Sequence, residues 1–153
     1  MELDDSRHAL NRILELAVLL NDDMTRDLAG RGLTGSRAHV LWELRDGTPK
    51  TQQALATALG VSPRTITGLI DGLVAGGFVT REAHPTDRRA TLVTFTKHGE
   101  RAAKELERDH IELARKLFDD MPTTTFRGFT RGLDAVLARL RETLATKDKT
   151  GPR

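Results

Sequence analysis

The chain has no cysteine and no tyrosine, and aromatic residues make up only 4% of its 153 positions. Without cysteine, disulfides, thiolate catalysis, cysteine-bound zinc and direct thiol redox sensing are excluded. No apolar run reaches the ~20 residues that a membrane-spanning helix needs. The acidic N-terminus, Met1 to Asp5, lacks the basic start and apolar stretch of a signal peptide. We therefore expect a soluble cytoplasmic protein.

Motifs of catalysis and metal binding are also missing. The sequence has no Gly-rich phosphate loop, no G-x-S-x-G elbow and no metal-spaced histidine pair. Its five histidines form no compact cluster with acidic residues. We expect a protein that is not an enzyme and that holds neither a cofactor nor a metal.

Positive charge is concentrated in the middle of the chain. The net charge of the whole chain is only +2, but residues 47–101 carry seven Lys/Arg against four Asp/Glu. The rest of the chain is slightly acidic. Because an anion-binding surface needs local charge and not global charge, the central segment is the candidate for nucleic-acid contact.

Apolar periodicity predicts helices before and after a short β segment. Four helices are expected first, over residues 6–30, 34–47, 51–59 and 62–76, with Ser6, Thr34 and Ser62 as N-caps. Pro49 predicts one short extended piece between the second and third helices. After the fourth helix the period changes, which predicts a β-hairpin with strands at 78–83 and 90–95. Two long helices follow, from Thr96 to about Met121 and around 126–144. The expected fold is mainly α, with a small β-hairpin.

The stretch Gln52 to Asp71 resembles a helix-turn-helix. Gly60 would make the turn with a positive φ, and Ala56 would lie where the two helices meet. The small core between these helices would consist of Leu55, Leu59, Val61, Ile66 and Leu69.

The second helix of this motif would leave a polar face outside. Its inward stripe would be Ile66, Leu69, Ile70 and Leu73, and its outward residues Arg64, Gly68 and Asp71, flanked by Thr65 and Thr67. An Arg and two Thr near a helix N-terminus suit the major groove, where Arg can bind guanine bidentately. An ordinary helical hairpin with a solvated face is the alternative. Asp71 would either repel phosphate or form an internal salt bridge.

A charged turn, His84 to Arg89, separates the two strands. It can act as a wing whose Arg reads a narrow minor groove. Asp87 can pair with Arg88 or Arg89 and hold an Arg extended. The alternative is a solvated turn.

Two motifs resemble the multiple antibiotic resistance regulator (MarR) family. One is Gly76-Gly77-Phe78-Val79-Thr80-Arg81. The other is the wing signature D-x-R, five residues, then L-T, which here is Asp87-Arg88-Arg89 followed by Phe95-Thr96, with Phe in place of Leu. The resemblance extends over nearly the whole chain and implies a winged helix-turn-helix with long N- and C-terminal dimerisation helices.

That resemblance implies a regulator, a repressor in our hypothesis, that binds palindromic double-stranded DNA as a homodimer. A recognition helix at 62–76 would enter the major groove and a wing at 84–90 the minor groove, with Arg89 as the minor-groove residue. The predicted DNA contacts are Ser62, Arg64, Thr65, Thr67, Asp87, Arg88 and Arg89. The domain division is 1–33 for an N-terminal dimerisation helix, 34–99 for the DNA-binding lobe, 100–146 for C-terminal dimerisation helices and 147–153 for a flexible tail.

Members of the family that this chain resembles often release DNA when a small molecule, commonly an aromatic acid or other phenolic, binds between the dimer helices and the DNA-binding lobe. The residues predicted to line such a site are Asn11, His39, Trp42 and His110. Each has an ordinary alternative, since a Trp is often core and a lone His is often structural.

The competing functional hypothesis is an architectural protein that binds DNA without sequence preference. Such proteins insert apolar wedges or carry more charge. The turn at 84–89 has no Phe, Leu or Ile, which favours the regulator.

Overall fold

A computed structural model of the protein describes the backbone of residues 3–150 and the side chains of residues 3–146. The chain divides into two compact units, Met1–Glu107 and Arg108–Arg153. None of the described helices is apolar over a length that could cross a membrane.

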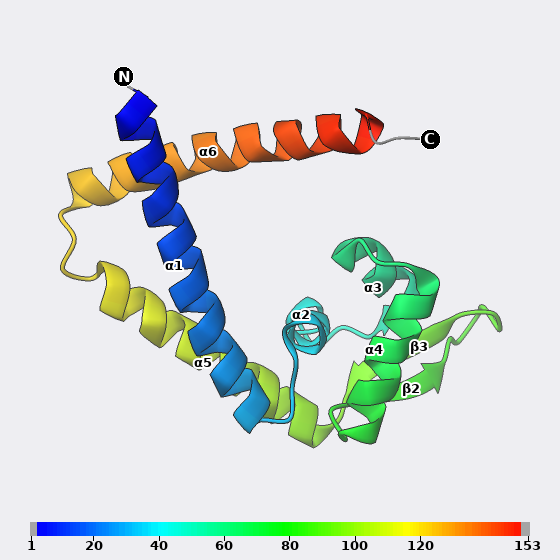
Figure 1. Cartoon of the computed structure of the whole chain (residues 1–153). Coiled ribbons are helices and arrows are strands. Elements are labelled where there is room, and N and C mark those ends of the chain that lie inside the picture. Colours follow the sequence, from blue (N-terminus) through cyan, green and yellow to red (C-terminus); the bar gives the residue numbers. More distant parts are fainter. Residues whose placement is uncertain (1–2, 151–153) are drawn as a thin grey trace. The chain divides into compact units, whose positions relative to one another are not determined.

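Six helices and three short strands are present in the described residues (Figure 1). In chain order they are α1 (Leu3–Gly30), α2 (Gly35–Glu43), β1 (Lys50–Thr51), α3 (Gln52–Leu59), α4 (Pro63–Ala75), β2 (Val79–Ala83), β3 (Thr91–Phe95), α5 (Lys97–Phe118) and α6 (Thr123–Thr150). The first unit ends within α5. The predicted class, mainly helical with a small β wing, is confirmed.

The sheet has three antiparallel strands in the order β1-β3-β2. The expected hairpin is present, with Val79 opposite Phe95 at one end and Ala83 opposite Thr91 at the other. The third strand, β1, lies at the short extended piece predicted near residue 49, but its pairing with the hairpin was not predicted, because a two-residue strand has no readable alternation. It pairs Lys50 with Val93 and thereby joins the start of α3 to the sheet.

The predicted start of the first helix is wrong. Ser6 lies inside α1, which already includes Leu3. Asp4 and Asp5 occupy the first turn, where carboxylates interact favourably with the helix dipole, and Asp4 pairs with Arg7 at 3.1 Å. Because of these charges the helix begins before Ser6, the residue that was expected to cap it.

The second helix is shorter than predicted. It ends at Glu43, with Leu44 as its C-cap, and not at Gly47. The Lys50 ammonium donates to the Glu43 carbonyl oxygen, and so satisfies one of the helix's terminal acceptors. Asp46 then accepts the Thr48 amide at 2.9 Å. This hydrogen bond lowers the pKa of the Asp46 carboxyl, and the nearby Lys50 charge adds to the effect.

The helix-turn-helix forms where it was expected. Thr51 caps α3, with its hydroxyl accepting the Ala54 amide at 3.1 Å, and Gly60 ends α3 at φ 65°. Ser62 caps α4 and Pro63 occupies its first turn, where a missing N–H costs nothing.

One apolar core holds the first unit together. Its fully buried large side chains come from α2, α3, α4 and the sheet, and are Val40, Leu41, Leu44, Leu55, Ile66, Ile70, Leu73, Val79 and Val93. No polar or charged side chain is buried among the described residues. The core therefore fixes the position of α4 by its inner face alone, and leaves its outer face to solvent.

The start of α5 is bound to the hairpin by Thr96. The Thr96 amide donates to the Phe78 carbonyl at 3.0 Å, and its hydroxyl donates to the Gly77 carbonyl at 2.6 Å. The same hydroxyl accepts the Gly99 amide at 2.9 Å. A Cβ at Gly99 would overlap the Phe78 carbonyl oxygen, so only glycine permits this approach.

The second unit contains the rest of α5 and α6. Phe118 of α5 contacts Phe126 and Phe129 of α6, with ring centroids 5.5 and 5.9 Å apart. The predicted tail at 147–153 lies partly outside the described residues, and α6 continues through Thr150.

Candidate nucleic-acid interface

The outer face of α4 has the composition that the sequence predicted. Arg64, Thr65, Thr67, Gly68 and Asp71 are all exposed, whereas the inward stripe of the same helix is buried or half-buried. The helix thus presents one basic, one acidic and two threonine side chains to solvent.

The first turn of α4 is held by its own side chains. Ser62 Oγ accepts the Thr65 amide at 3.1 Å, and the hydroxyls of Ser62 and Thr65 are hydrogen-bonded at 2.9 Å. A capped N-terminus with a positive dipole end is suited to a nearby phosphate. Arg64 lies in this turn and has no hydrogen bond or ion pair among the described residues, so its guanidinium can meet a base edge.

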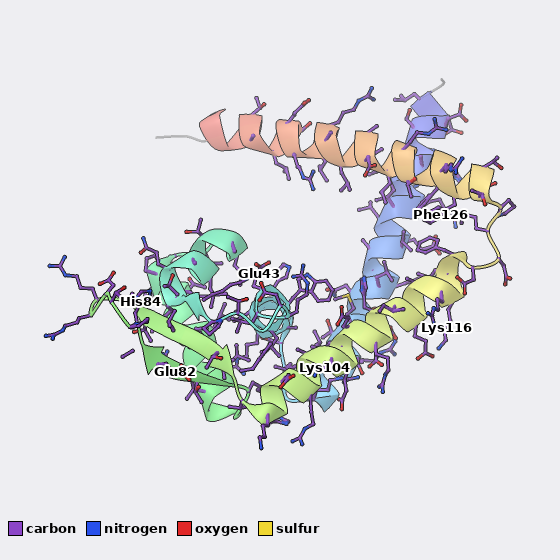
Figure 2. The ribbon with its side chains drawn as sticks, turned by 180° about the vertical axis from the view of Figure 1, so that it is seen from behind. Glu43, Glu82, His84, Lys104, Lys116 and Phe126 are labelled. Atoms are coloured by element: carbon purple, nitrogen blue, oxygen red, sulfur yellow. The ribbon has the colours of Figure 1, made fainter. Side chains whose placement is uncertain are left out.

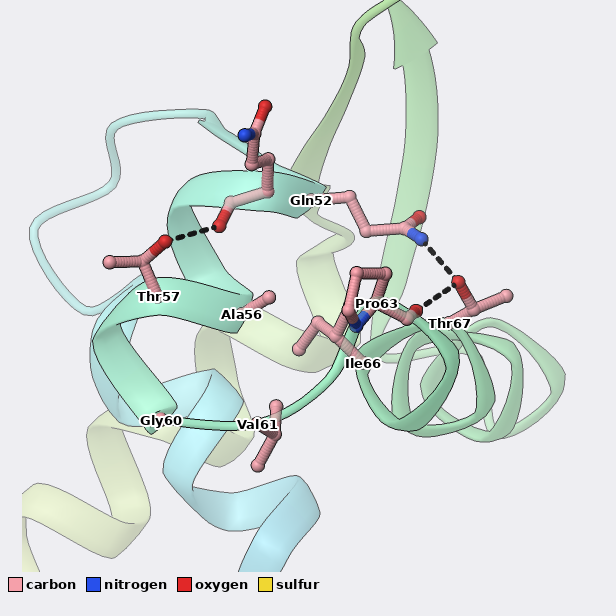
Figure 3. Close-up of a pocket in the computed structure, with 9 residues that line it drawn as sticks. Gln52, Ala56, Thr57, Gly60, Val61, Pro63, Ile66 and Thr67 are labelled. Atoms are coloured by element: carbon pink, nitrogen blue, oxygen red, sulfur yellow. Dashed lines mark hydrogen bonds between the residues drawn. The ribbon is translucent and has the colours of Figure 1, made fainter.

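Thr67 uses its hydroxyl inside the motif. The hydroxyl donates to the Pro63 carbonyl at 2.8 Å and accepts from Gln52 Nε2 at 2.8 Å, as Figure 3 shows. The hydroxyl proton is therefore not free to bind a phosphate oxygen, and the Thr67 methyl suits contact with a thymine methyl. Thr67 and Gln52 also border an open groove of about 520 Å³ between α3 and α4.

Asp71 is the partner in a salt bridge. Its Oδ1 lies 2.6 Å from Arg81 Nη2 on β2. Of the two roles left open for this carboxylate, the structure contains the internal pair. Arg81 also donates through Nε to Gln52 Oε1, at 3.4 Å.

The wing tip is organised by two side chains that accept backbone N–H groups. His84 Nδ1 accepts the amides of Thr86, at 3.2 Å, and Asp87, at 3.0 Å. Asp87 Oδ1 accepts the Arg89 amide at 2.9 Å. Within residues 3–146, Asp87 forms no ion pair with either wing guanidinium, so the expected side-chain pairing is wrong. A short turn lets the carboxylate reach the backbone first. Arg88 and Arg89 are exposed.

Hydrogen bonds place the wing tip and the start of α4 at the same end of the lobe. The Phe78 amide donates to the Leu73 carbonyl at 2.9 Å, near the end of α4, and Arg81 meets Asp71 further back along the helix. β2 and α4 therefore run in opposite directions, so the wing end of β2 lies at the same end of the lobe as Arg64 at the start of α4. The hairpin extends beyond the helices at that end (Figure 1), and His84 lies where it leaves the lobe (Figure 2).

The sequence did not predict a role on this surface for three residues, Gln52, Arg81 and His84. Arg81 and His84 stand inside or beside the recognised motifs, but nothing in the pattern shows their partners. His84 precedes Pro85, in a turn position where Asn or Asp often bonds the following amides, and that similarity was the available signal.

Three of the four predicted effector residues belong to the first unit and one belongs to the second. Asn11, His39 and Trp42 are exposed positions of α1 and α2, and His110 is an exposed position of α5 in the second unit. Trp42 is 36% exposed and lies under the Arg45 guanidinium, 4.6 Å from its ring centroid. The effector site stays a prediction. Among the described residues, no group of three or more His, Asp or Glu could hold a metal ion.

The architecture of the first unit defines a class. Three helices packed on a small sheet, with a helix-turn-helix at α3–α4 and a projecting hairpin, form a winged helix-turn-helix. This class is associated with double-stranded DNA.

Comparison with known proteins finds similar regulators for this part of the chain. Residues 33–91 match the model of the MarR family. The HTH-type transcriptional repressor YetL of Bacillus subtilis is 27% identical over 130 residues, which are 84% of this chain and 78% of that protein. The match over residues 33–91 agrees with the resemblance that the two sequence motifs predicted. The family is a class of regulators and not of enzymes.

Two solved structures have a similar fold over most of the length of this chain. AbsC, a MarR family regulator from Streptomyces coelicolor, aligns with a TM-score of 0.74 at 25% identity, covering 93% of this chain and 98% of that one. Streptococcus pneumoniae FabT, solved in complex with DNA, aligns with a TM-score of 0.77 at 18% identity, covering 93% and 99%. The second of these likenesses concerns the fold alone.

Proposed function

We propose that this protein is a repressor that binds a palindromic operator as a homodimer, with α4 in the major groove and the wing in the minor groove. The observation that carries the proposal is the joint exposure of Arg64 and the wing arginines at one end of the lobe. One apolar core packs α4 and the hairpin together within the first unit. One face of a duplex can therefore meet both.

Base reading is assigned to the first turn of α4. Arg64 is the candidate for bidentate contact with guanine, and the Thr67 methyl for contact with thymine. Ser62 and Thr65, at the capped helix start, are candidates for phosphate contact and set the register without reading sequence.

The wing is assigned to the minor groove. Arg88 and Arg89 are adjacent cations on a turn that His84 and Asp87 keep short. Narrow A/T-rich minor grooves have an enhanced negative potential that attracts inserted Arg. Arg89, whose amide is bound by Asp87, is the candidate for insertion.

Dimerisation is assigned to the helices at the two ends of the chain. α1 buries only Leu28, and α6 buries none of its described residues within a single chain. The exposed large apolar residues of α6 recur at helical spacing and are Phe126, Phe129, Val136, Leu137, Leu140 and Leu144. Contiguous apolar faces of this kind mark association surfaces. We assign residues 1–33 and 100–146 to the dimer, and 34–99 to the DNA-binding lobe.

Repression and release by a small aromatic or phenolic effector complete the proposal. YetL supports the sign of regulation, because it is described as a repressor. Asn11, His39, Trp42 and His110 are the proposed effector contacts.

Selection of bound sequences from a random DNA pool with the purified protein tests the proposal. We expect an inverted repeat with half-sites one helical turn apart, about 10 base pairs centre to centre, and affinity that falls steeply with salt. Equal affinity for selected and random DNA would instead identify an architectural protein.

A further inference from the structure

Arg81 connects β2 to both helices of the helix-turn-helix. Its Nη2 lies 2.6 Å from Asp71 Oδ1 on α4, and its Nε donates to Gln52 Oε1 on α3 at 3.4 Å. Gln52 donates in turn to Thr67 Oγ1 on α4 at 2.8 Å. Four side chains thus form one hydrogen-bonded network that joins β2, at the base of the wing, to α3 and α4.

This network contributes little to folding. The side chains of Arg81 and Asp71 are 32% and 61% exposed, and ion pairs this open to solvent contribute little to stability. Its location suggests another role. Asp71 is on the outer face of α4, where a bound duplex would bring phosphates near its carboxylate, and like charges brought together weaken association.

We propose that Arg81 is a positioning residue that couples the wing to α4 and cancels the Asp71 carboxylate, so that one duplex can contact both elements. The proposal rests on the proposed function. It differs from a simple phosphate contact because it makes the effect of Arg81 depend on Asp71.

A role in cancelling Asp71 and a role in contacting phosphate predict opposite effects of Asp71 on the affinity lost when Arg81 is removed. If Arg81 cancels Asp71, removing Arg81 costs less affinity once Asp71 has been neutralised. If Arg81 contacts phosphate, neutralising Asp71 frees the guanidinium, and removing Arg81 then costs as much or more. A double-mutant cycle separates these cases, since it isolates the interaction of two residues from their individual effects.

The cycle uses the full chain and its pool-selected DNA, with wild type, Arg81→Gln, Asp71→Asn and the double variant compared by fluorescence anisotropy at one salt concentration. We expect Arg81→Gln to weaken binding about tenfold in the wild-type background and about threefold or less beside Asp71→Asn. An equal or greater loss beside Asp71→Asn overturns the proposal.

Lys104→Gln is the matched control, because Lys104 pairs with Glu100 at 2.7 Å on an exposed helix face and loses the same charge. We expect it to change affinity by less than about twofold. If Arg81→Gln and Lys104→Gln weaken binding equally, the specific role of Arg81 is refuted.

A measurement without DNA separates this proposal from the proposed function. Amide hydrogen exchange of the full chain should quicken in residues 79–83 in Arg81→Gln, with a melting temperature close to that of the wild type, and Arg81→Lys should show an intermediate effect. Unchanged exchange refutes the coupling. A wild-type protein with no preferred DNA sequence refutes the proposed function, while the exchange result still decides the coupling.

Discussion

Whether a residue of the lobe can contact DNA depends on whether its polar atoms already form hydrogen bonds within the protein. The Thr67 hydroxyl has two partners within the motif, whereas Arg64, one turn earlier, has none among the described residues. A group whose hydrogen-bonding capacity is satisfied internally gains little by approaching a base. Arg64 is therefore the stronger candidate for sequence reading, although both residues lie on the same exposed face.

Arg64→Ala should relax base preference at one position of each half-site, with a loss of discrimination of about 1–3 kcal/mol. The expected cause is loss of a bidentate contact to guanine. Repeating the pool selection with the variant measures the change. Thr65→Ser, which keeps the hydroxyl at the helix cap, is the control and should leave the preference intact. An unaltered preference in Arg64→Ala would remove Arg64 from the reading role.

His84→Ala should loosen the wing tip, because the amides of Thr86 and Asp87 lose their acceptor. We expect about a threefold to tenfold loss of affinity, the amount of one or two lost hydrogen bonds, on sites with A/T-rich flanks and a smaller loss on G/C-rich flanks. Titration of the two site types with labelled DNA measures this difference.

His84→Asn supplies the control, since an Asn side-chain oxygen at this position can accept the same amides. It should retain most of the affinity. Equal losses in the Ala and Asn variants would show that the imidazole contacts DNA itself and does not organise the turn.

At the scale of elements, glycine and threonine determine how α5 leaves the hairpin. Thr96 binds the carbonyls of Gly77 and Phe78, and the absent side chain of Gly99 lets the first turn of α5 rest on the Phe78 backbone. The wing root and α5 are thereby joined by backbone groups and by the Thr96 hydroxyl, and the exposed side chains of the wing take no part.

Gly99→Ala should destabilise the first unit by about 1–3 kcal/mol, because the added methyl overlaps a backbone oxygen that cannot rotate away. Thermal and urea unfolding of the full chain measure the effect. Gly128→Ala in α6 is the matched control, as nothing lies within 4 Å of the added atom, and it should stabilise by up to about 1 kcal/mol. A neutral Gly99→Ala would mean that α5 shifts freely against the hairpin.

At the scale of the whole molecule, the central question is what covers the apolar faces of α1 and α6. Soluble monomers rarely expose such continuous faces. A second copy would cover both faces and would supply the two-fold symmetry that a palindromic operator requires.

Leu137→Glu combined with Leu140→Glu should convert a dimer to a monomer, because two carboxylates would have to lose water at the interface. Sedimentation of wild type and variant at matched concentrations measures this, and operator affinity should fall by about 100-fold or more as half of the contact is lost. Arg139→Glu, at an exposed position outside the apolar stripe, is the control and should remain dimeric. A wild type that sediments as a monomer at all concentrations would refute the dimer.

The sequence alone determined the helix-turn-helix, its caps and the outward residues of α4. Local rules suffice there: Ser62 and Pro63 begin a helix, Gly60 permits the positive φ of the turn, and a 3.6-residue period separates Ile66 and Ile70 from Arg64. The wing hairpin followed from its change of period, and the resemblance to the MarR family followed from its motif.

Only the tertiary structure decided which polar groups are already engaged. The pairing of Asp71 with Arg81, ten residues apart, and that of Gln52 with Thr67, fifteen apart, depend on how α3, α4 and β2 pack. A two-residue strand and a histidine that accepts backbone amides likewise leave no periodic trace. Periodicity reports which face of a helix is buried, whereas hydrogen-bond partners depend on distances that arise only when separate elements come together.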